Sequence, residues 1–335
     1  MTYITLPAFY CPFPSQLSPL VEEVHQHTLA WASSYNLLQK EAALRRFNGA
    51  RYAWLAARTY PQAGFAELAL TNDFFSWLFL LDDQFDDGLL GRQPERMQEV
   101  IQGLLAILGV VSGEPLQGPL ARALYELWDR MLPLTTPRWR TRFIRHLLAY
   151  FDSYGWETRN RASGTIPDVE VYIEVRQDAG AMRLALDYMD LTEHIDLPVE
   201  IYQSSLVQVL LRLTNNIVCW SNDIFSLEKE LARGDLNNLV LAIQQERGSS
   251  LPEAIARVNE LVTREVLLFQ EISQLALVGV SDYRPDLQKY LAGMQAWIRG
   301  NLDWSLESQR YSHVEHAAPG VTPSYLENIL SISPE

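Results

Sequence analysis

Two long stretches of this chain are almost free of the residues that break helices, and they restrict the fold more than any other feature. Residues 62–93 contain no proline and residues 65–87 contain no glycine, while residues 181–233 contain no glycine and a single proline. Long apolar runs without these breakers are typical of helices, several of them buried. Alternating patterns with hairpin turns, which would predict strands, are scarce. We therefore predict an all-α fold of about ten or more helices, with residues 1–335 forming a single domain.

The N-terminal segment differs from the rest of the chain because residues 1–19 hold four prolines among aromatic residues. Proline interrupts a helix interior, so this segment is expected to form an extended strap. It lacks the basic region and apolar core of a signal peptide. No stretch of about 18 uncharged apolar residues follows that would span a bilayer. These features predict a cytoplasmic protein without a membrane span.

The charge of the chain limits its partners. It carries 41 Asp and Glu against 27 Lys and Arg, a formal net charge of −14. Such a chain has no electrostatic reason to bind nucleic acid or an anionic membrane surface, so neither is expected as a partner. Local acidic clusters, in contrast, can gather divalent cations. Cys11 and Cys219 match neither a disulfide framework nor a zinc site.

The first acidic cluster closes the first breaker-free run and places four carboxylates within six residues. Its members are Asp82, Asp83, Asp86 and Asp87. At a helix C-terminus these groups repel one another and oppose the helix dipole unless cations bind there. Hard divalent cations, above all Mg²⁺, suit such oxygen ligands. A solvated acidic helix end is an equally good interpretation of this cluster taken alone.

The second cluster is a stripe of oxygen-bearing side chains. Asn222, Ser226 and Glu230 follow one another at intervals of four residues. Each interval turns a helix by about 400°, so the three side chains share one face. An amide, a hydroxyl and a carboxylate together form a reasonable oxygen triad for one Mg²⁺. Lys229 lies beside the stripe and could meet an anion, although a polar stripe facing solvent is the better interpretation of this segment in isolation.

Together these elements resemble the motifs of class I terpene synthases, specifically the bacterial and fungal single-domain cyclases. The segment 82–86 resembles the aspartate-rich motif, and the segment 222–230 resembles the second metal motif without departure; the two begin 140 residues apart. Arg176 to Gly180 is similar to the diphosphate-sensing segment of the family. Arg310-Tyr311 is similar to its C-terminal Arg-Tyr pair. The resemblance covers essentially the whole chain.

The resemblance implies a Mg²⁺-dependent enzyme that ionises an isoprenyl diphosphate and releases diphosphate. Farnesyl diphosphate is the expected substrate and a sesquiterpene the expected product, with C20 or C10 substrates as alternatives. Three Mg²⁺ ions are expected on the two metal motifs, with Mn²⁺ able to substitute. Asp86 and Asp87 satisfy the two spacings found in the family equally well, so that choice stays open. The resemblance also implies a homodimer as one option and a C-terminal lid or tail over residues 312–335.

Roles for the remaining candidate residues follow from the same resemblance. Arg176 would sense the diphosphate, and Gly180 would act through its carbonyl at the bond being ionised. The other diphosphate contacts would be Lys229, Arg310 and Tyr311. Aromatic faces stabilise a moving positive charge by about 0.5–2 kcal/mol each. The candidates for this aromatic wall are Phe75, Phe79 and Trp304, with ordinary core packing as the alternative for each.

Two rival interpretations share part of this pattern. A chain-elongating prenyl diphosphate synthase would have the same fold and first motif, but it should carry a second aspartate-rich motif where this chain has Asn222, Ser226 and Glu230. A non-catalytic helical binding protein would not require both metal motifs to be intact. A protonation-initiated, class II cyclase needs an Asp-x-Asp-Asp motif, which the chain lacks.

Overall fold

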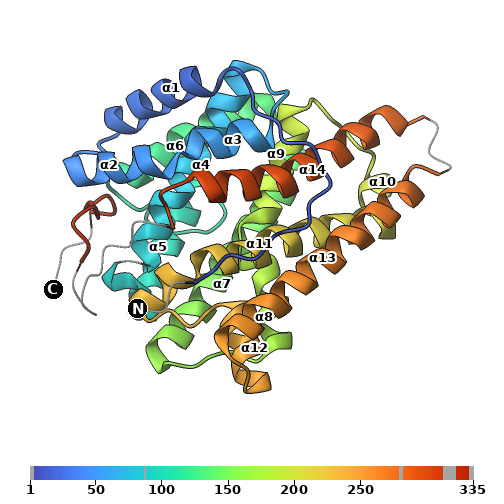
Figure 1. The fold of residues 1–335 in the computed structure, drawn as a ribbon. Helices are drawn as coiled ribbons and strands as arrows, with labels where there is room; N and C mark the ends of the chain where they lie inside the picture. Colours follow the sequence, from blue (N-terminus) through green and yellow to red (C-terminus); the bar gives the residue numbers. More distant parts are fainter. Residues whose placement is uncertain (1–3, 87, 279–281, 312–321, 332–335) are drawn as a thin grey trace.

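The computed structural model describes residues 4–86, 88–278, 282–311 and 322–331, and within these ranges every regular element is a helix (Figure 1). Two short 3₁₀-helices, η1 (Leu89–Arg92) and η2 (Leu132–Leu134), accompany the α-helices. The α-helices are α1 (Val21–Ser34), α2 (Glu41–Ala50), α3 (Tyr52–Thr59), α4 (Phe65–Asp86), α5 (Pro94–Ile107), α6 (Pro119–Met131), α7 (Pro137–Ser163), α8 (Val169–Ala179), α9 (Met182–Thr192), α10 (Val199–Tyr202), α11 (Ser205–Arg233), α12 (Leu239–Arg247), α13 (Leu251–Ala276) and α14 (Arg284–Glu307). The all-α prediction is confirmed.

Local sequence signals define the ends of the two longest described helices. α7 begins where the Thr136 side chain accepts a hydrogen bond from a backbone N–H of the first turn, and α11 begins in the same way at Ser204. Both end at a glycine in the left-handed region, Gly164 with φ 64° and Gly234 with φ 70°. Side-chain caps and left-handed glycines satisfy the unpaired backbone groups of helix ends. These local signals therefore fix where α7 and α11 begin and end.

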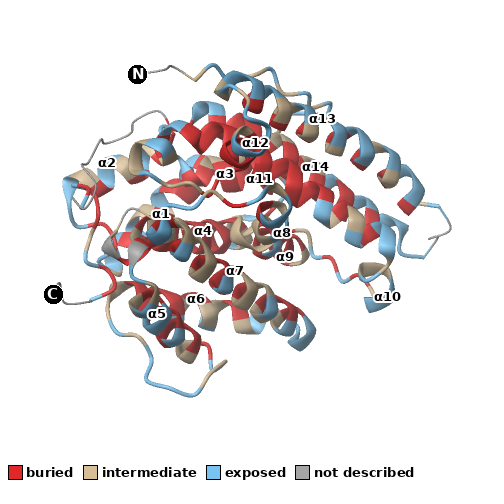
Figure 2. Ribbon diagram, turned by 90° about the horizontal axis from the view of Figure 1, so that it is seen from below, coloured by how far each residue is buried: buried red, intermediate tan, exposed pale blue. Residues whose placement is uncertain are grey.

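The core is one cluster of buried apolar side chains to which nearly all of the α-helices contribute. α4 is buried on nearly all sides, as expected for a helix that is apolar all round. α11 packs along α13 and also contacts α14, which in turn packs against α3. Figure 2 shows buried residues concentrated on α3, α4, α11 and α14, with exposed residues on the outer faces of α10 and α13. Within the described residues, no helix is long and apolar enough to cross a bilayer.

Both terminal segments lie against the helices. Residues 4–20 contain no helix and run over α11 and α13, where Phe9 stacks on Phe225 and Phe13 packs edge-on to Phe269. Of the predicted lid, residues 312–321 and 332–335 lie outside the described residues. Residues 322–331 pack beside α2 and the start of α6, where the Leu120 N–H donates to the Ile329 carbonyl (3.0 Å).

Candidate active site

The last turn of α4 brings two of its carboxylates to a cavity inside the helices. Asp82 and Asp86, which share a helix face, both line this cavity, and we refer to them as the α4 wall. Asp82 accepts hydrogen bonds from the Tyr154 hydroxyl (3.0 Å) and from Arg310 (2.8 Å), and Asp86 pairs with Arg161 (2.6 Å). Burial, together with the neighbouring Asp86, raises the pKa of Asp82 to about 6.

Asp83 points away from the cavity, although the sequence places it among the metal-binding candidates. Its carboxylate receives two hydrogen bonds from Arg46 (3.0 and 3.1 Å) and one from Arg310 (3.2 Å). Burial favours the protonated form, but these two guanidinium groups hold the pKa of Asp83 well below its usual range. Asp83 therefore serves in this structure as an anchor for two arginines. Asp87 lies outside the described residues.

The polar stripe of α11 lines the opposite side of the same cavity. We refer to Asn222, Ser226 and Glu230 as the α11 wall. The Asn222 amide donates to the Tyr311 hydroxyl (2.7 Å), and the Ser226 hydroxyl donates to the Asn222 carbonyl (2.9 Å). Burial and nearby carboxylates raise the pKa of Glu230 to about 7, although Asn238 donates to its carboxylate (2.7 Å). The predicted stripe therefore does not face solvent.

Cationic groups surround both walls. Arg176, near the end of α8, forms an ion pair with Asp223 (2.7 Å) and donates to the side-chain oxygen of Asn222 (3.0 Å). Its Nε is buried without a hydrogen-bond partner among the described residues. Lys229 and Arg310 also line the cavity, and both are nearly fully buried. These side chains could turn several N–H groups toward an anion held between the walls.

Gly180 sits in the break between α8 and α9, where α11 comes close to its backbone. It caps the end of α8, and the next residue, Ala181, adopts a left-handed conformation with φ 54°. A Cβ atom on Gly180 would lie 2.2 Å from the Cys219 sulfur of α11. A side chain fits there only if Cys219 or its surroundings move. The break thus exposes backbone polar groups at the cavity edge, where Gly180 and Ala181 both line the surface.

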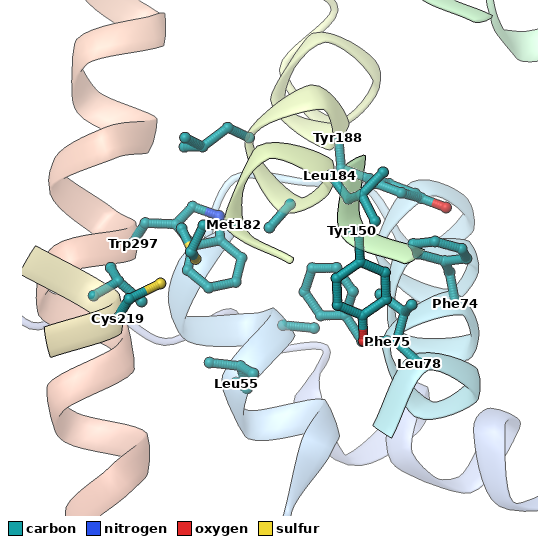
Figure 3. Close-up of a cluster of buried hydrophobic side chains, with 14 of the residues drawn as sticks. Leu55, Phe74, Phe75, Leu78, Tyr150, Met182, Leu184, Tyr188, Cys219 and Trp297 are labelled. Carbon is teal, nitrogen blue, oxygen red and sulfur yellow. The ribbon is translucent and has the colours of Figure 1, made fainter. Parts of the chain in front are cut away.

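The whole cavity has a volume of about 180 Å³. Away from the two walls, its lining is mostly apolar. Figure 3 shows side chains from α3, α4, α7, α9, α11 and α14 converging there, including Leu55, Phe75 and Trp297. The predicted aromatic residues Phe75, Phe79 and Trp304 all line the cavity. Phe75 meets Trp297 with ring centres 5.8 Å apart, and Phe79 lies 5.8 Å from Trp304.

Some residues that belong to this site were not among the sequence candidates. Trp297 lines the cavity about two helical turns before Trp304, so a seven-residue spacing of tryptophans was the available signal. Tyr150 lines the cavity from α7, and its hydroxyl lies 2.6 Å from that of Tyr154, which in turn donates to Asp82. The spacing of four residues between the tyrosines was their only sequence signal.

The donor chemistry of the two walls fits a hard divalent cation. Carboxylate, amide and hydroxyl oxygens face one cavity, and burial raises the pKa of both Asp82 and Glu230, so their negative charges are poorly compensated. Within the described ranges, no three Asp, Glu, His or Cys side chains converge closely enough to hold a metal ion.

A family model described as "Terpene synthase family 2, C-terminal metal binding" matches residues 73–266, a span that includes both walls. This chain belongs to the terpene synthase family. The germacrene A synthase of Nostoc punctiforme is 35% identical to it over 94% of this chain and 98% of its own. A (+)-T-muurolol synthase from Roseiflexus castenholzii, whose name describes it as cyclising (2E,6E)-farnesyl diphosphate, is 39% identical over 90% of this chain and 92% of its own.

Solved structures agree with this assignment. A variant of cucumene synthase superposes with a TM-score of 0.81 and 28% identity, covering 90% of this chain and all (100%) of its own. Hedycaryol synthase superposes with a TM-score of 0.78 and 26% identity, covering 90% and 98% of the two chains. The terpene synthase described here therefore has the class I terpenoid synthase fold, and the domain that the family model matches is a metal-binding one.

Proposed function

We propose that this terpene synthase is a Mg²⁺-dependent sesquiterpene synthase that ionises farnesyl diphosphate, cyclises the carbocation and releases diphosphate. One observation carries the proposal: two oxygen-bearing walls, on α4 and α11, face each other across one cavity whose remaining lining is largely apolar. The muurolol synthase named above, which its name describes as cyclising (2E,6E)-farnesyl diphosphate, supports farnesyl diphosphate over C10 and C20 substrates. Incubation with diphosphates of the three lengths tests it.

For the metal, we propose that Asp82 and Asp86 of the α4 wall and all three residues of the α11 wall supply the ligands, with Asp87 as an alternative to Asp86. Three Mg²⁺ ions, for which Mn²⁺ can substitute, would neutralise charge on the leaving diphosphate. Asp83 fits this role poorly because Arg46 and Arg310 already occupy its carboxylate.

The cationic side chains would hold the diphosphate from the other directions. Arg176 keeps an unpaired buried Nε at the α11 wall, and Arg310 lies against the α4 wall through Asp82. Lys229 and the Tyr311 hydroxyl line the same space. Charge-assisted hydrogen bonds from these groups favour the anion that forms when the C–O bond breaks and its electron pair leaves with the diphosphate.

After ionisation, the cavity has to protect a carbocation from water. The faces of its aromatic rings are electron-rich, and each can stabilise the carbocation by about 0.5–2 kcal/mol without reacting with it. Phe75 and Trp304 are nearly fully buried, so solvent does not compete for them. The final proton would pass to the diphosphate, or the Gly180 carbonyl would assist, so no conventional general base is required.

Replacing Arg310 by Ala is expected to weaken Mg²⁺-dependent diphosphate binding more than tenfold. Its guanidinium contacts Asp82, Asp83 and the Tyr52 hydroxyl, so it is already held beside the α4 wall. Losing a buried charged partner of an anion typically costs 2–5 kcal/mol. Calorimetric titration with pyrophosphate in the presence of Mg²⁺ measures this effect. Unchanged affinity would show that Arg310 does not contribute to diphosphate binding.

We also propose that residues 1–335 form one catalytic domain, and that the enzyme works in the cytoplasm as a homodimer. The dimer has a candidate surface on the outer side of α13, where Leu267 and Leu275 are 47% and 54% exposed. Exposed apolar side chains that gather on one helix face are typical of protein interfaces.

A further inference from the structure

Residues 322–331 follow the Arg-Tyr pair in the sequence. One side chain of this segment, Tyr325, contacts an arginine near each of the two walls. Tyr325 is only 7% exposed. Its ring lies 4.0 Å from the guanidinium carbon of Arg46 on α2, and its hydroxyl accepts a hydrogen bond from Arg233 (2.6 Å) at the end of α11. Figure 1 shows this segment beside α2, at the end of the molecule where α5 lies.

Each of these arginines connects Tyr325 to a residue that neighbours one of the two walls. Arg46 makes the paired hydrogen bonds to Asp83, the residue that follows Asp82 of the α4 wall. Arg233 lies three residues after Glu230 of the α11 wall, and it lines a small rim cavity together with Asp86 and Glu230. Tyr325 therefore contacts the support of the α4 wall on one side and the end of the α11 wall on the other.

The chemistry of a phenol suits this bridge. The two walls carry buried carboxylates of the same sign, which repel each other across the cavity. The Tyr325 side chain is neutral, and it contacts one arginine on the face of its ring and another at its hydroxyl oxygen. It therefore joins the two sides without adding charge. The rest of the segment secures the bridge: Glu327 accepts hydrogen bonds from the Gln39 and Lys40 N–H groups, and the Lys40 amine donates to the Leu326 carbonyl (2.6 Å).

We infer that Tyr325 is a positioning residue that holds the α4 and α11 walls at the separation needed to bind Mg²⁺ and diphosphate together. Its ring contact with Arg46 and its hydrogen bond from Arg233 carry its effect to the two walls. This inference rests on the proposed function. Residues that hydrogen-bond to metal ligands typically change metal affinity by about 10–100-fold when replaced, and because Tyr325 lies one contact further out we expect an effect at the low end of this range.

The decisive variant is Tyr325→Phe, which keeps the ring over Arg46 and removes only the hydroxyl that accepts from Arg233. The Mg²⁺ concentration at which pyrophosphate half-saturates the protein, measured by calorimetry or thermal shift, should rise about tenfold. Turnover at saturating Mg²⁺ should change less than about threefold. Glu327→Gln is the matched control, because it loosens the same segment at the α1–α2 connection without contacting either arginine, and it should leave the Mg²⁺ requirement unchanged.

A double variant shows whether the effect passes through Arg233. Adding Tyr325→Phe to Arg233→Ala should cause no further rise in the Mg²⁺ requirement, since the two residues act as one unit. An unchanged Mg²⁺ requirement in Tyr325→Phe, or equal shifts in Tyr325→Phe and Glu327→Gln, would overturn the inference while leaving the proposed function intact. Absence of Mg²⁺-dependent pyrophosphate binding in the unaltered chain would overturn both.

Discussion

Asp82→Asn is expected to lower turnover by about two to three orders of magnitude while leaving the fold intact. Tyr154 and Arg310 donate to different carboxylate oxygens of Asp82, so the single amide oxygen keeps one of these hydrogen bonds, and the substitution removes the negative charge that the α4 wall offers to a cation. Losing one preorganised electrostatic group at a reacting centre typically costs about 10²–10³-fold in rate. Because burial already raises the pKa of Asp82 to about 6, neutralising it should not lower the melting temperature.

Asp83→Asn is the matched control, one residue away, and it should behave in the opposite way. It leaves the buried guanidinium groups of Arg46 and Arg310 without their shared carboxylate, which typically costs about 3–5 kcal/mol of stability. The pKa of Asp83 is held below its usual range, so this contribution is present above pH of about 4 and is lost as the solution is acidified. Urea unfolding and single-turnover rates separate the two effects. Near-normal turnover in Asp82→Asn would show that its ligand assignment is wrong.

Asn222→Ala is expected to have an effect of similar size, because one amide serves three partners. Its oxygen accepts from Arg176, its nitrogen donates to Tyr311, and the same oxygen faces the cavity as a metal candidate. Truncation therefore disconnects the α11 wall from two diphosphate contacts at once. We expect turnover to fall about 10²–10³-fold.

Asn216→Ala provides the control on the same helix. Asn216 is more deeply buried than Asn222, but its side chain binds Gln177 and Glu265 and does not line the cavity. Removing it should lower the free energy of unfolding by about 1–3 kcal/mol and change turnover only a few-fold. If both variants lose turnover to the same extent, then Asn222 contributes to stability and has no direct role in metal binding or in the reaction.

The sequence predicted those parts of the site that depend on helix periodicity. Asn222, Ser226 and Glu230 fall on one face because four residues are close to one helical turn, and the structure places all three on the cavity. The absence of glycine and proline through residues 65–86 likewise predicted a long helix that ends in carboxylates.

Other features depend on contacts between distant segments, which periodicity cannot supply. Asp83 turns from the cavity because Arg46 of α2 and Arg310, which follows α14, meet at its carboxylate. Trp297 belongs to α14, which is buried along much of its length. The hydrophobic pattern of this helix therefore did not show which of its faces lines the cavity. The docking of residues 322–331 depends on partners in α2, α6 and α11, far from it in the sequence.

The central claim is that this chain converts farnesyl diphosphate to a cyclic C15 product with the help of Mg²⁺. Gas chromatography with mass spectrometry of extracts from incubations with C10, C15 and C20 diphosphates, each with Mg²⁺ or with excess chelator, measures this directly. We predict a cyclic sesquiterpene hydrocarbon or alcohol from the C15 substrate, and its disappearance when Mg²⁺ is removed. Absence of a cyclic product from all three substrates, or a product that forms equally well in chelator, would contradict the account.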